Sequence, residues 1–137
     1  MIIDCHGHYT TAPKALENWR NQQIAGIKDS ALMPKVADLK ISDDELIETI
    51  ESNQLRLMKE RGSDLTIFSP RASFMAHHIG DFNVSSTWAA ICNELCYRVS
   101  TLFPDHFIPA AMLPQSPGVD PATCIPELEK CVKEYGN

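Results

Sequence analysis

The feature that most constrains the fold of this chain is an alternation of short apolar runs with longer patterns of helical period. Apolar runs typical of β-strands lie at residues 1–5, 65–68 and 107–113. Each run precedes a region in which apolar residues recur every three or four positions, as they do on one face of a helix. Strands that alternate with helices build a parallel sheet covered by helices. The sequence therefore predicts an α/β fold.

Local signals set the bounds of the predicted helices. Ser42 followed by Glu45 has the form of a capping box, in which each residue satisfies a backbone N–H of the other. Gly62 suits the left-handed residue that ends many helices. Elsewhere the spacing of apolar residues and the positions of proline and glycine mark the ends. The helices expected on these grounds span residues 15–24, 43–61, 88–103 and 123–135.

The length of the chain sets a limit on the architecture. With 137 residues it supplies about three strand and helix pairs, whereas a complete (β/α)8 barrel needs about 250 residues. Three parallel strands also leave a sheet edge uncovered. We therefore expect residues 1–137 to form one partial domain, the N-terminal part of a TIM-type barrel, with a continuation beyond residue 137.

Composition excludes several classes of partner. The net charge is -6, and the 12 lysines and arginines are scattered, which argues against a nucleic-acid surface. The sequence contains no apolar run near the roughly 20 residues that span a bilayer, and its start lacks the pattern of a signal peptide. We expect a cytoplasmic protein that acts on a small molecule, and whether it forms a homo-oligomer is left open.

The five cysteines are interpreted as small buried residues. Their number is odd and they form no Cys-x-x-Cys pair. Cys92 and Cys96 lie one helical turn apart, but their apolar neighbours mark that helix face as core. We assign no metal to them.

The tripeptide His6-Gly7-His8 is the strongest chemical feature. In a strand, residues two apart point to the same side, so both imidazoles can approach one ion, and Gly7 would let the backbone pass close to it. Imidazole is a common zinc ligand, and a catalytic zinc takes about three protein ligands. The pair is thus half of a metal site, or alternatively two polar residues at a strand end.

Polar residues after the second strand are candidates for substrate binding. In α/β barrels the chemistry collects at the C-terminal ends of the strands. Arg71 offers a planar fork that binds a carboxylate through two hydrogen bonds, and Ser73 and His77 could add further contacts. Each has a structural alternative: an ion pair with a surface acid for Arg71, a turn cap for Ser73, and a structural hydrogen bond for His77.

The stretch at residues 9–40 is the other candidate for a functional segment. A long first loop over a barrel mouth could act as a lid, and it could equally pack at a subunit interface. Trp19 and Ile24 could serve either role.

Three segments resemble the amidohydrolase superfamily, in the branch that contains decarboxylases and hydratases of aromatic degradation. They are Ile-Ile-Asp-Cys-His-Gly-His at 2–8, Phe-Ser-Pro-Arg-Ala-Ser-Phe-Met-Ala-His-His at 68–78 and Leu-Pro-Gln-Ser-Pro-Gly-Val-Asp at 113–120. The resemblance implies a (β/α)8 barrel with zinc bound by His6 and His8. It also implies a further histidine and an acidic ligand from later strands.

The activity implied by the resemblance is that of a metal-dependent hydratase. Such a lyase would add water to the conjugated double bond of a polycarboxylate keto acid in the 4,5-cleavage degradation of protocatechuate. Hydration of this kind needs an activated water and a proton donor, and the sequence assigns neither the acid nor the base. The alternatives are a metal-dependent hydrolase or decarboxylase of the same superfamily, or an inactive fragment of one.

Overall fold

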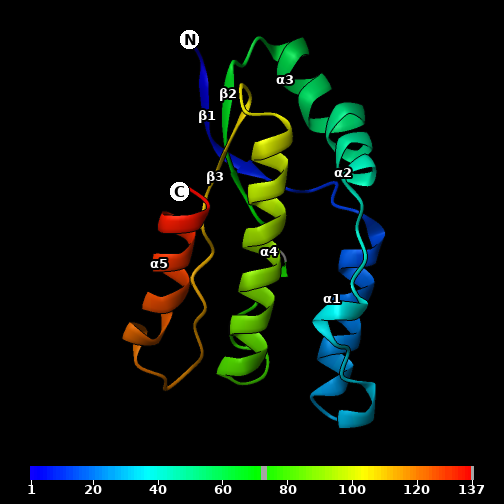
Figure 1. Ribbon diagram of the computed structural model, residues 1–137, viewed down its shortest axis with the longest axis vertical. Helices are drawn as coiled ribbons and strands as arrows, with labels where there is room; N and C mark the ends of the chain where they lie inside the picture. The colour runs from blue at the N-terminus through cyan, green and yellow to red at the C-terminus, as the bar shows by residue number, and fades with distance from the viewer. Residues whose placement is uncertain (72–73, 137) are drawn as a thin grey trace.

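Three parallel strands form a single sheet in the order β1-β2-β3, as the alternation predicted. The structure is a computed structural model and describes residues 1–71 and 74–136. Figure 1 shows the path of the chain. In chain order the elements are β1 (Ile3–His8), α1 (Lys14–Gly26), 3-10 turns at Ser30–Leu32 and Val36–Asp38, α2 (Asp43–Thr49), a π-helical turn (Ile50–Leu55), α3 (Arg56–Arg61), β2 (Leu65–Ser69), α4 (Phe82–Leu102), β3 (Phe107–Pro109), a 3-10 turn at Pro121–Cys124, and α5 (Ile125–Glu134).

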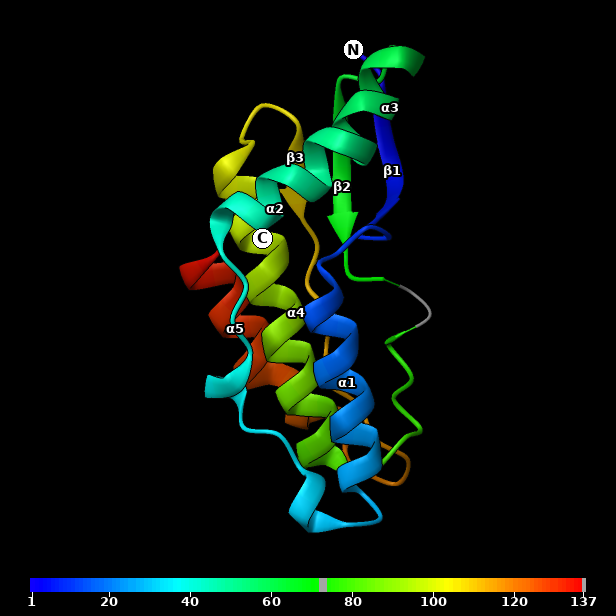
Figure 2. The same cartoon turned by 90° about the vertical axis from the view of Figure 1, so that its right-hand side faces the viewer.

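The strands occupy one end of the molecule, and several helices extend beyond their C-terminal ends (Figure 1). Helix α4 runs back along the sheet, and α2 lies against α4 near the strands. Helix α1 lies beside the half of α4 that projects past the strands (Figure 2). The C-terminal ends of all three strands therefore open toward the region bordered by α1 and the start of α4.

One face of the sheet is covered and the other is bare. Phe68 of β2 is fully buried, as is Val99 of α4, in one continuous apolar core. On the opposite face Ile3, Ile67 and Ile108 remain 50%, 37% and 43% exposed. Residues that alternate along a strand point to opposite faces, so the helices of this chain cover only one side of its sheet.

The capping box at the start of α2 is confirmed. The Ser42 hydroxyl accepts from the Glu45 backbone N–H at 3.2 Å, and the Glu45 carboxylate accepts from the Ser42 N–H at 2.9 Å. Gly62 ends α3 with a φ of 70°. The expectation of one continuous α-helix over 43–61 was wrong, because a π-helical turn separates α2 from α3.

The first strand is longer than predicted and the third is shorter. Strand β1 continues to His8, so the two histidines lie at its C-terminal end, as predicted. Strand β3 spans only Phe107–Pro109, not 107–113. Pro109 has no backbone N–H, so it cannot donate to the hydrogen-bond ladder of the sheet. Further on, the Asn93 side chain takes the place of a neighbouring strand, since it accepts from the Met112 N–H at 2.7 Å and donates to the Met112 carbonyl at 2.9 Å.

Helix α4 begins six residues earlier than the predicted start at 88. The Asp81 side chain caps it by accepting from the Val84 N–H at 3.0 Å, a cap that the apolar pattern alone did not reveal. Within the described residues no helix combines the length and apolarity needed to cross a membrane.

The segment 9–40 is largely ordered by α1, which confirms the short helix predicted at 15–24. Trp19 is buried and stacks on Trp88 of α4, with ring centroids 6.2 Å apart and planes 9° apart. The Trp19 indole N–H also donates to the Lys35 carbonyl at 3.0 Å. This tryptophan is therefore part of the core and does not form an exposed lid or interface surface.

The cysteines follow the interpretation with two exceptions. Cys92, Cys96 and Cys131 are buried, whereas Cys5 is exposed and Cys124 is half-buried. Burial raises the pKa of the Cys92 and Cys96 thiols, which keeps both protonated and poor as metal ligands.

Candidate functional site

A β-bulge shapes the end of β1 that carries the two histidines. From Asp4 to Gly7 the strand advances three residues, while its partner β2 advances only two, from Thr66 to Phe68. An extra residue of this kind bends the strand and re-aims its side chains. The simple alternation assumed for His-x-His is therefore modified at this point.

The two imidazoles nevertheless converge. The Nε2 atoms of His6 and His8 are 3.2 Å apart, and the ring planes stand at 88° with centroids 4.7 Å apart. Two nitrogen ligands, each about 2.05 Å from a tetrahedral zinc ion, would be separated by about 3.3 Å. The observed separation therefore fits two ligands of one divalent metal.

The hydrogen bonds of His8 leave its Nε2 available as a ligand. Its Nδ1 lies 3.0 Å from the carbonyl of Pro70 and 2.7 Å from the hydroxyl of Ser69. The carbonyl can only accept, and the Ser69 hydroxyl donates its proton to the Gly7 carbonyl at 2.8 Å. The proton of the neutral ring must therefore sit on Nδ1, and Nε2 keeps the lone pair that a metal needs.

Gly7 is required by the neighbouring strand. A Cβ at this position would lie 2.0 Å from Cγ2 of Thr66 and 2.9 Å from the Ile67 carbonyl oxygen. The sequence suggested that Gly7 would let the backbone approach an ion. The structure instead shows that it allows β1 and β2 to approach each other at the bulge.

Side chains from the helical layer hold the end of β1. Gln54, in the π-helical turn, donates to the carbonyl of His8 and accepts from the Thr11 hydroxyl at 2.8 Å. Thr49 lies 2.6 Å from the Tyr9 hydroxyl, and burial raises the pKa of Tyr9 to about 12. Sequence reasoning missed Gln54 and Thr49, because nothing in a helical pattern distinguishes them from surface positions.

A hollow of about 180 Å³ lies beside β1 and gives access to this site. Both histidines and Gln54 line it, together with Arg61 and Thr66. Among residues 1–71 and 74–136 no group of three or more His, Cys, Asp or Glu could hold a metal.

Arg71 lies just after β2 and is exposed. It directly follows Pro70, the residue that accepts from His8. Its guanidinium lies 4.6 Å over the ring of Phe74, and within the described part of the chain it forms no ion pair with an acidic side chain. Ser73 lies outside the described residues.

His77 is half-buried and is bound to α4. Its Nδ1 lies 3.1 Å from the Ser85 hydroxyl, which also accepts from the Gln115 N–H at 3.1 Å. Burial lowers the pKa of His77, and the nearby Arg20 guanidinium lowers it further. The structure therefore places His77 in a link between the loops after β2 and β3.

Arg20 is a buried cation that the sequence did not reveal. Its side chain is 1% exposed, donates to the Gln23 amide oxygen at 2.5 Å, and lies 4.9 Å over the Trp88 ring. Gln23 in turn donates to the Val84 carbonyl at 3.2 Å. These contacts fasten α1 to the first turns of α4.

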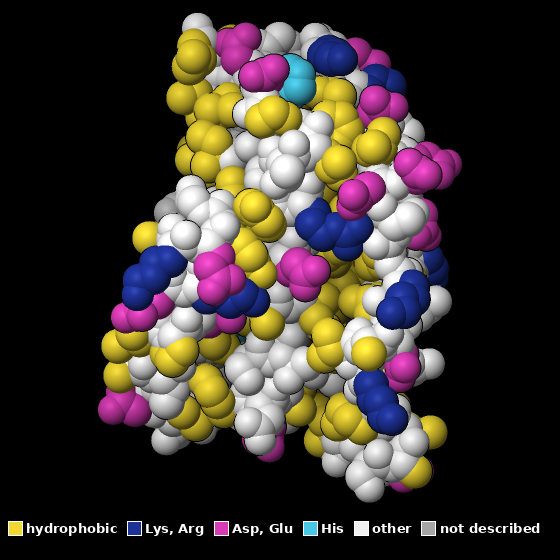
Figure 3. All heavy atoms as spheres, viewed as in Figure 1, with side chains coloured by type: hydrophobic (Ala, Val, Ile, Leu, Met, Phe, Trp, Pro, Cys, Tyr) yellow, Lys and Arg dark blue, Asp and Glu magenta, His cyan; other side chains and the backbone are white. Residues whose placement is uncertain are grey.

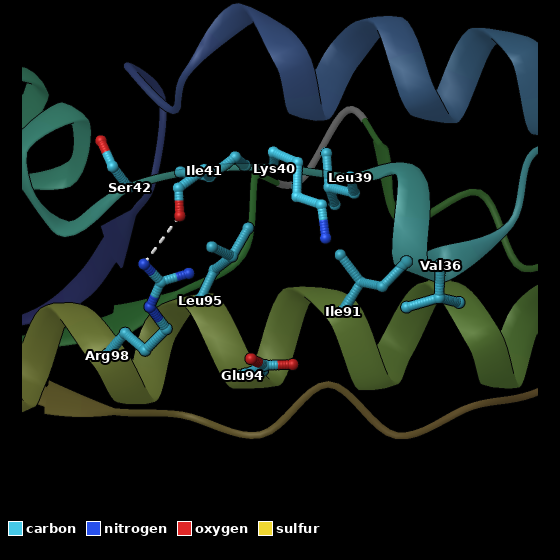
Figure 4. Close-up of a pocket in the computed structure, with 9 residues that line it drawn as sticks. All are labelled: Val36, Leu39, Lys40, Ile41, Ser42, Ile91, Glu94, Leu95 and Arg98. Atoms are coloured by element: carbon cyan, nitrogen blue, oxygen red, sulfur yellow. Dashed lines mark hydrogen bonds between the residues drawn. The ribbon is translucent and has the colours of Figure 1, made fainter.

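A second hollow, larger than the one at β1, is separate from the histidines. It measures about 440 Å³ and lies on the outer side of α4, between that helix and the chain leading into α2 (Figures 3 and 4). Arg98 closes one end of the hollow: its guanidinium donates a hydrogen bond to the Ile41 carbonyl at 2.9 Å and forms an ion pair with the Asp43 carboxylate at 2.6 Å. Its lining residues are Val36, Leu39, Lys40, Ile41, Ser42, Ile91, Glu94, Leu95 and Arg98. None of these residues lines the hollow at β1, so we do not place the chemistry here.

Comparison with known proteins shows close relatives of this chain. A 2-keto-4-carboxy-3-hexenedioate hydratase from Sphingobium sp. (strain NBRC 103272 / SYK-6) is 58% identical over 136 residues, which cover 99% of this chain and 39% of the relative. The crystal structure of a 4-oxalomesaconate hydratase from Rhodopseudomonas palustris is 79% identical, with a TM-score of 0.93, and the match again covers 99% of this chain and 39% of that one. The chain thus spans about two fifths of the length of these relatives.

A more distant structure shares the fold. A dihydroxybenzoic acid decarboxylase from Polaromonas sp. JS666, with bound manganese and 2-nitroresorcinol, is 26% identical over 98% of this chain and 36% of that chain, with a TM-score of 0.59. The sequence profile of the amidohydrolase family matches residues 3–137, nearly the whole chain. The chain therefore belongs to the amidohydrolase family.

Proposed function

We propose that this chain is the N-terminal part of a metal-dependent hydratase that adds water to the conjugated double bond of 4-oxalomesaconate, in the 4,5-cleavage degradation of protocatechuate. The observation that carries the proposal is the convergence of His6 and His8 at the C-terminal end of β1 in a chain 79% identical to a 4-oxalomesaconate hydratase. The decarboxylase is only 26% identical, so we place hydration ahead of decarboxylation.

We further propose that the sheet continues into a (β/α)8 barrel. The bare face carrying Ile3, Ile67 and Ile108 would then line the barrel interior, and the missing metal ligands would come from later strands. This arrangement would put His6 and His8 at the mouth, where α/β barrels carry their chemistry.

In this proposal His6 and His8 hold a divalent metal, with zinc as the preferred ion because two neutral imidazoles suit it. When bound, such an ion acts as a Lewis acid or lowers the pKa of a bound water. Ser69 and the Pro70 carbonyl keep His8 in the tautomer that exposes Nε2. These residues orient the ligand.

Arg71 is proposed to bind a carboxylate of the substrate. Arg71 is exposed, its guanidinium stacks on Phe74, and it forms no ion pair among the described residues, so its fork can bind a planar anion. Ser73 and His77 stay predictions as further substrate ligands. We expect Arg71→Lys to raise KM about tenfold with a smaller change in kcat, because lysine keeps the charge and loses the paired hydrogen bonds. An unchanged KM would contradict this role.

The metal site is tested in the full-length protein. We expect one divalent metal per chain by elemental analysis, and loss of that metal in the double variant His6→Ala, His8→Ala. Hydration, followed by the fall in absorbance of the conjugated keto acid, should drop at least about 100-fold. The matched control is His106→Ala, a histidine that precedes β3 at the opposite end of the strands. Retention of metal and activity by the double variant would refute the assignment.

The products separate hydration from the alternatives. Hydration adds the mass of water and releases nothing, whereas a decarboxylase releases carbon dioxide and a hydrolase cleaves an amide. Mass spectrometry of the product mixture distinguishes the three. Activity of the full-length protein that is absent from residues 1–137 alone would favour the inactive fragment.

A further inference from the structure

The π-helical turn Ile50–Leu55 brings two side chains to the end of β1. In a regular α-helix these side chains would point in different directions. Thr49 and Gln54 are five residues apart and both contact the chain just after the histidines. In an α-helix, residues five apart point about 140° away from each other, given 3.6 residues per turn. A π turn closes i→i+5 bonds and brings such residues to the same side.

Gln54 uses both ends of its amide. The Nε2 donates to the His8 carbonyl, and the Oε1 accepts from the Thr11 hydroxyl at 2.8 Å. The His8 carbonyl also accepts from the Thr10 N–H at 2.8 Å. Gln54 therefore fixes the turn that follows β1 at two points, the His8 carbonyl and the Thr11 hydroxyl.

We propose that Gln54 is a positioning residue for the metal pair, and that the π-helical turn exists to deliver it. His8 is held at two points: its ring by Ser69 and Pro70, and its peptide carbonyl by Gln54. With both points fixed, the ring has little freedom to rotate away from His6. The inference rests on the proposed metal site and deepens it.

A side chain supports the backbone carbonyls at this irregular turn. The Ser52 hydroxyl donates to the Glu48 carbonyl at 2.6 Å and lies 3.4 Å from the Thr49 carbonyl, so a side chain satisfies carbonyls at the point where the regular pattern breaks. Gln54 itself is half-buried and lines the hollow shared with both histidines. Its position fits a role toward that hollow.

The test compares Gln54→Met with Asn53→Met in the full-length protein. Methionine keeps the length of Gln54 and removes both hydrogen bonds. Asn53 is the neighbouring position, and within the described residues its amide forms one side-chain hydrogen bond, to the Ser52 hydroxyl at 3.0 Å. We expect Gln54→Met to weaken the affinity for Co²⁺ and Zn²⁺, measured by competition with a chelator, by at least about tenfold, the usual effect of losing an outer-sphere partner. Asn53→Met should stay within twofold.

Urea unfolding of Gln54→Met separates positioning from folding. A loss of metal affinity with a urea midpoint close to that of the parent would assign the effect to the site and not to the fold. The Co²⁺ absorption spectrum of Gln54→Met should also change, because ligand geometry sets it. Unchanged affinity and spectrum in Gln54→Met would overturn the inference alone. A parent protein that binds neither metal would overturn the proposed site together with it.

Discussion

Replacement of Gly7 by alanine would test whether the bulge of β1 depends on close contact between strands. The new Cβ would lie 2.0 Å from Cγ2 of Thr66, whereas carbon atoms in contact are normally about 3.5 to 4.0 Å apart. At least about 1.5 Å must therefore open between β1 and β2. Thr66 is only 5% exposed and donates to the Met58 sulfur at 3.3 Å, and its branched side chain has little rotamer freedom.

Two opposing effects set the change in the free energy of unfolding that Gly7→Ala causes. Overpacking of a buried site costs about 1 to 3 kcal/mol, and we take the upper end because the overlap is large and Thr66 is fixed. The loss of glycine freedom in the unfolded chain returns about 0.4 to 1 kcal/mol. We expect a net loss of about 2 kcal/mol in the free energy of unfolding, which is about 30-fold in the unfolding equilibrium.

The assay is urea unfolding of the full-length protein followed by circular dichroism, with Thr66→Ser as the companion change. Serine keeps the hydroxyl and removes the methyl group that Gly7→Ala would strike. The double variant should be more stable than the sum of the two single losses by about 1 kcal/mol, a coupling expected only for residues in contact. A loss below about 0.5 kcal/mol for Gly7→Ala, or strict additivity in the double variant, would refute the reasoning.

Three further outcomes are expected. Ser42→Ala should lower the free energy of unfolding by about 1 kcal/mol through loss of the capping box, and an unchanged urea midpoint would contradict it. Asn93→Ala should lower the free energy of unfolding by about 3 kcal/mol, because it leaves both backbone groups of Met112 without partners in the core. A loss under about 1 kcal/mol would argue against the importance of the two Asn93–Met112 hydrogen bonds. His77 has a pKa below its ordinary 6.5, so the unfolded chain binds the proton more readily and stability should fall as pH drops below about 6.5. A His77→Gln variant should show a flatter pH dependence between pH 5 and 7, and equal slopes would exclude His77 as the source.

Much of the fold was predictable because its signals are local. The capping box at Ser42 and the left-handed end at Gly62 depend only on residues nearby in sequence, and both were confirmed. The short length of β3 was not predictable. It depends on Asn93, which reaches from α4 to bind Met112 across 19 residues of sequence. An apolar run cannot reveal which partner takes its backbone hydrogen bonds.

The site was predictable only in part, for the same reason. His6 and His8 stand two residues apart, so their convergence follows from strand geometry with a small change at the bulge. Gln54 was invisible because its role requires a π turn, and no local signal marks one. Trp19 was misread as exposed, because its burial depends on Trp88, 69 residues later in the chain.

The stacked pair Trp19 and Trp88 gives the molecule a built-in optical reporter. These are the only tryptophans among the 137 residues, and one belongs to α1 while the other belongs to α4. Indoles with ring centroids 6.2 Å apart are close enough for their electronic transitions to couple. Detachment of α1 from α4 would remove that coupling and change the near-ultraviolet circular dichroism, while the far-ultraviolet helix signal persists. Circular dichroism of the two tryptophans can thus report whether α1 moves relative to α4, without any added label.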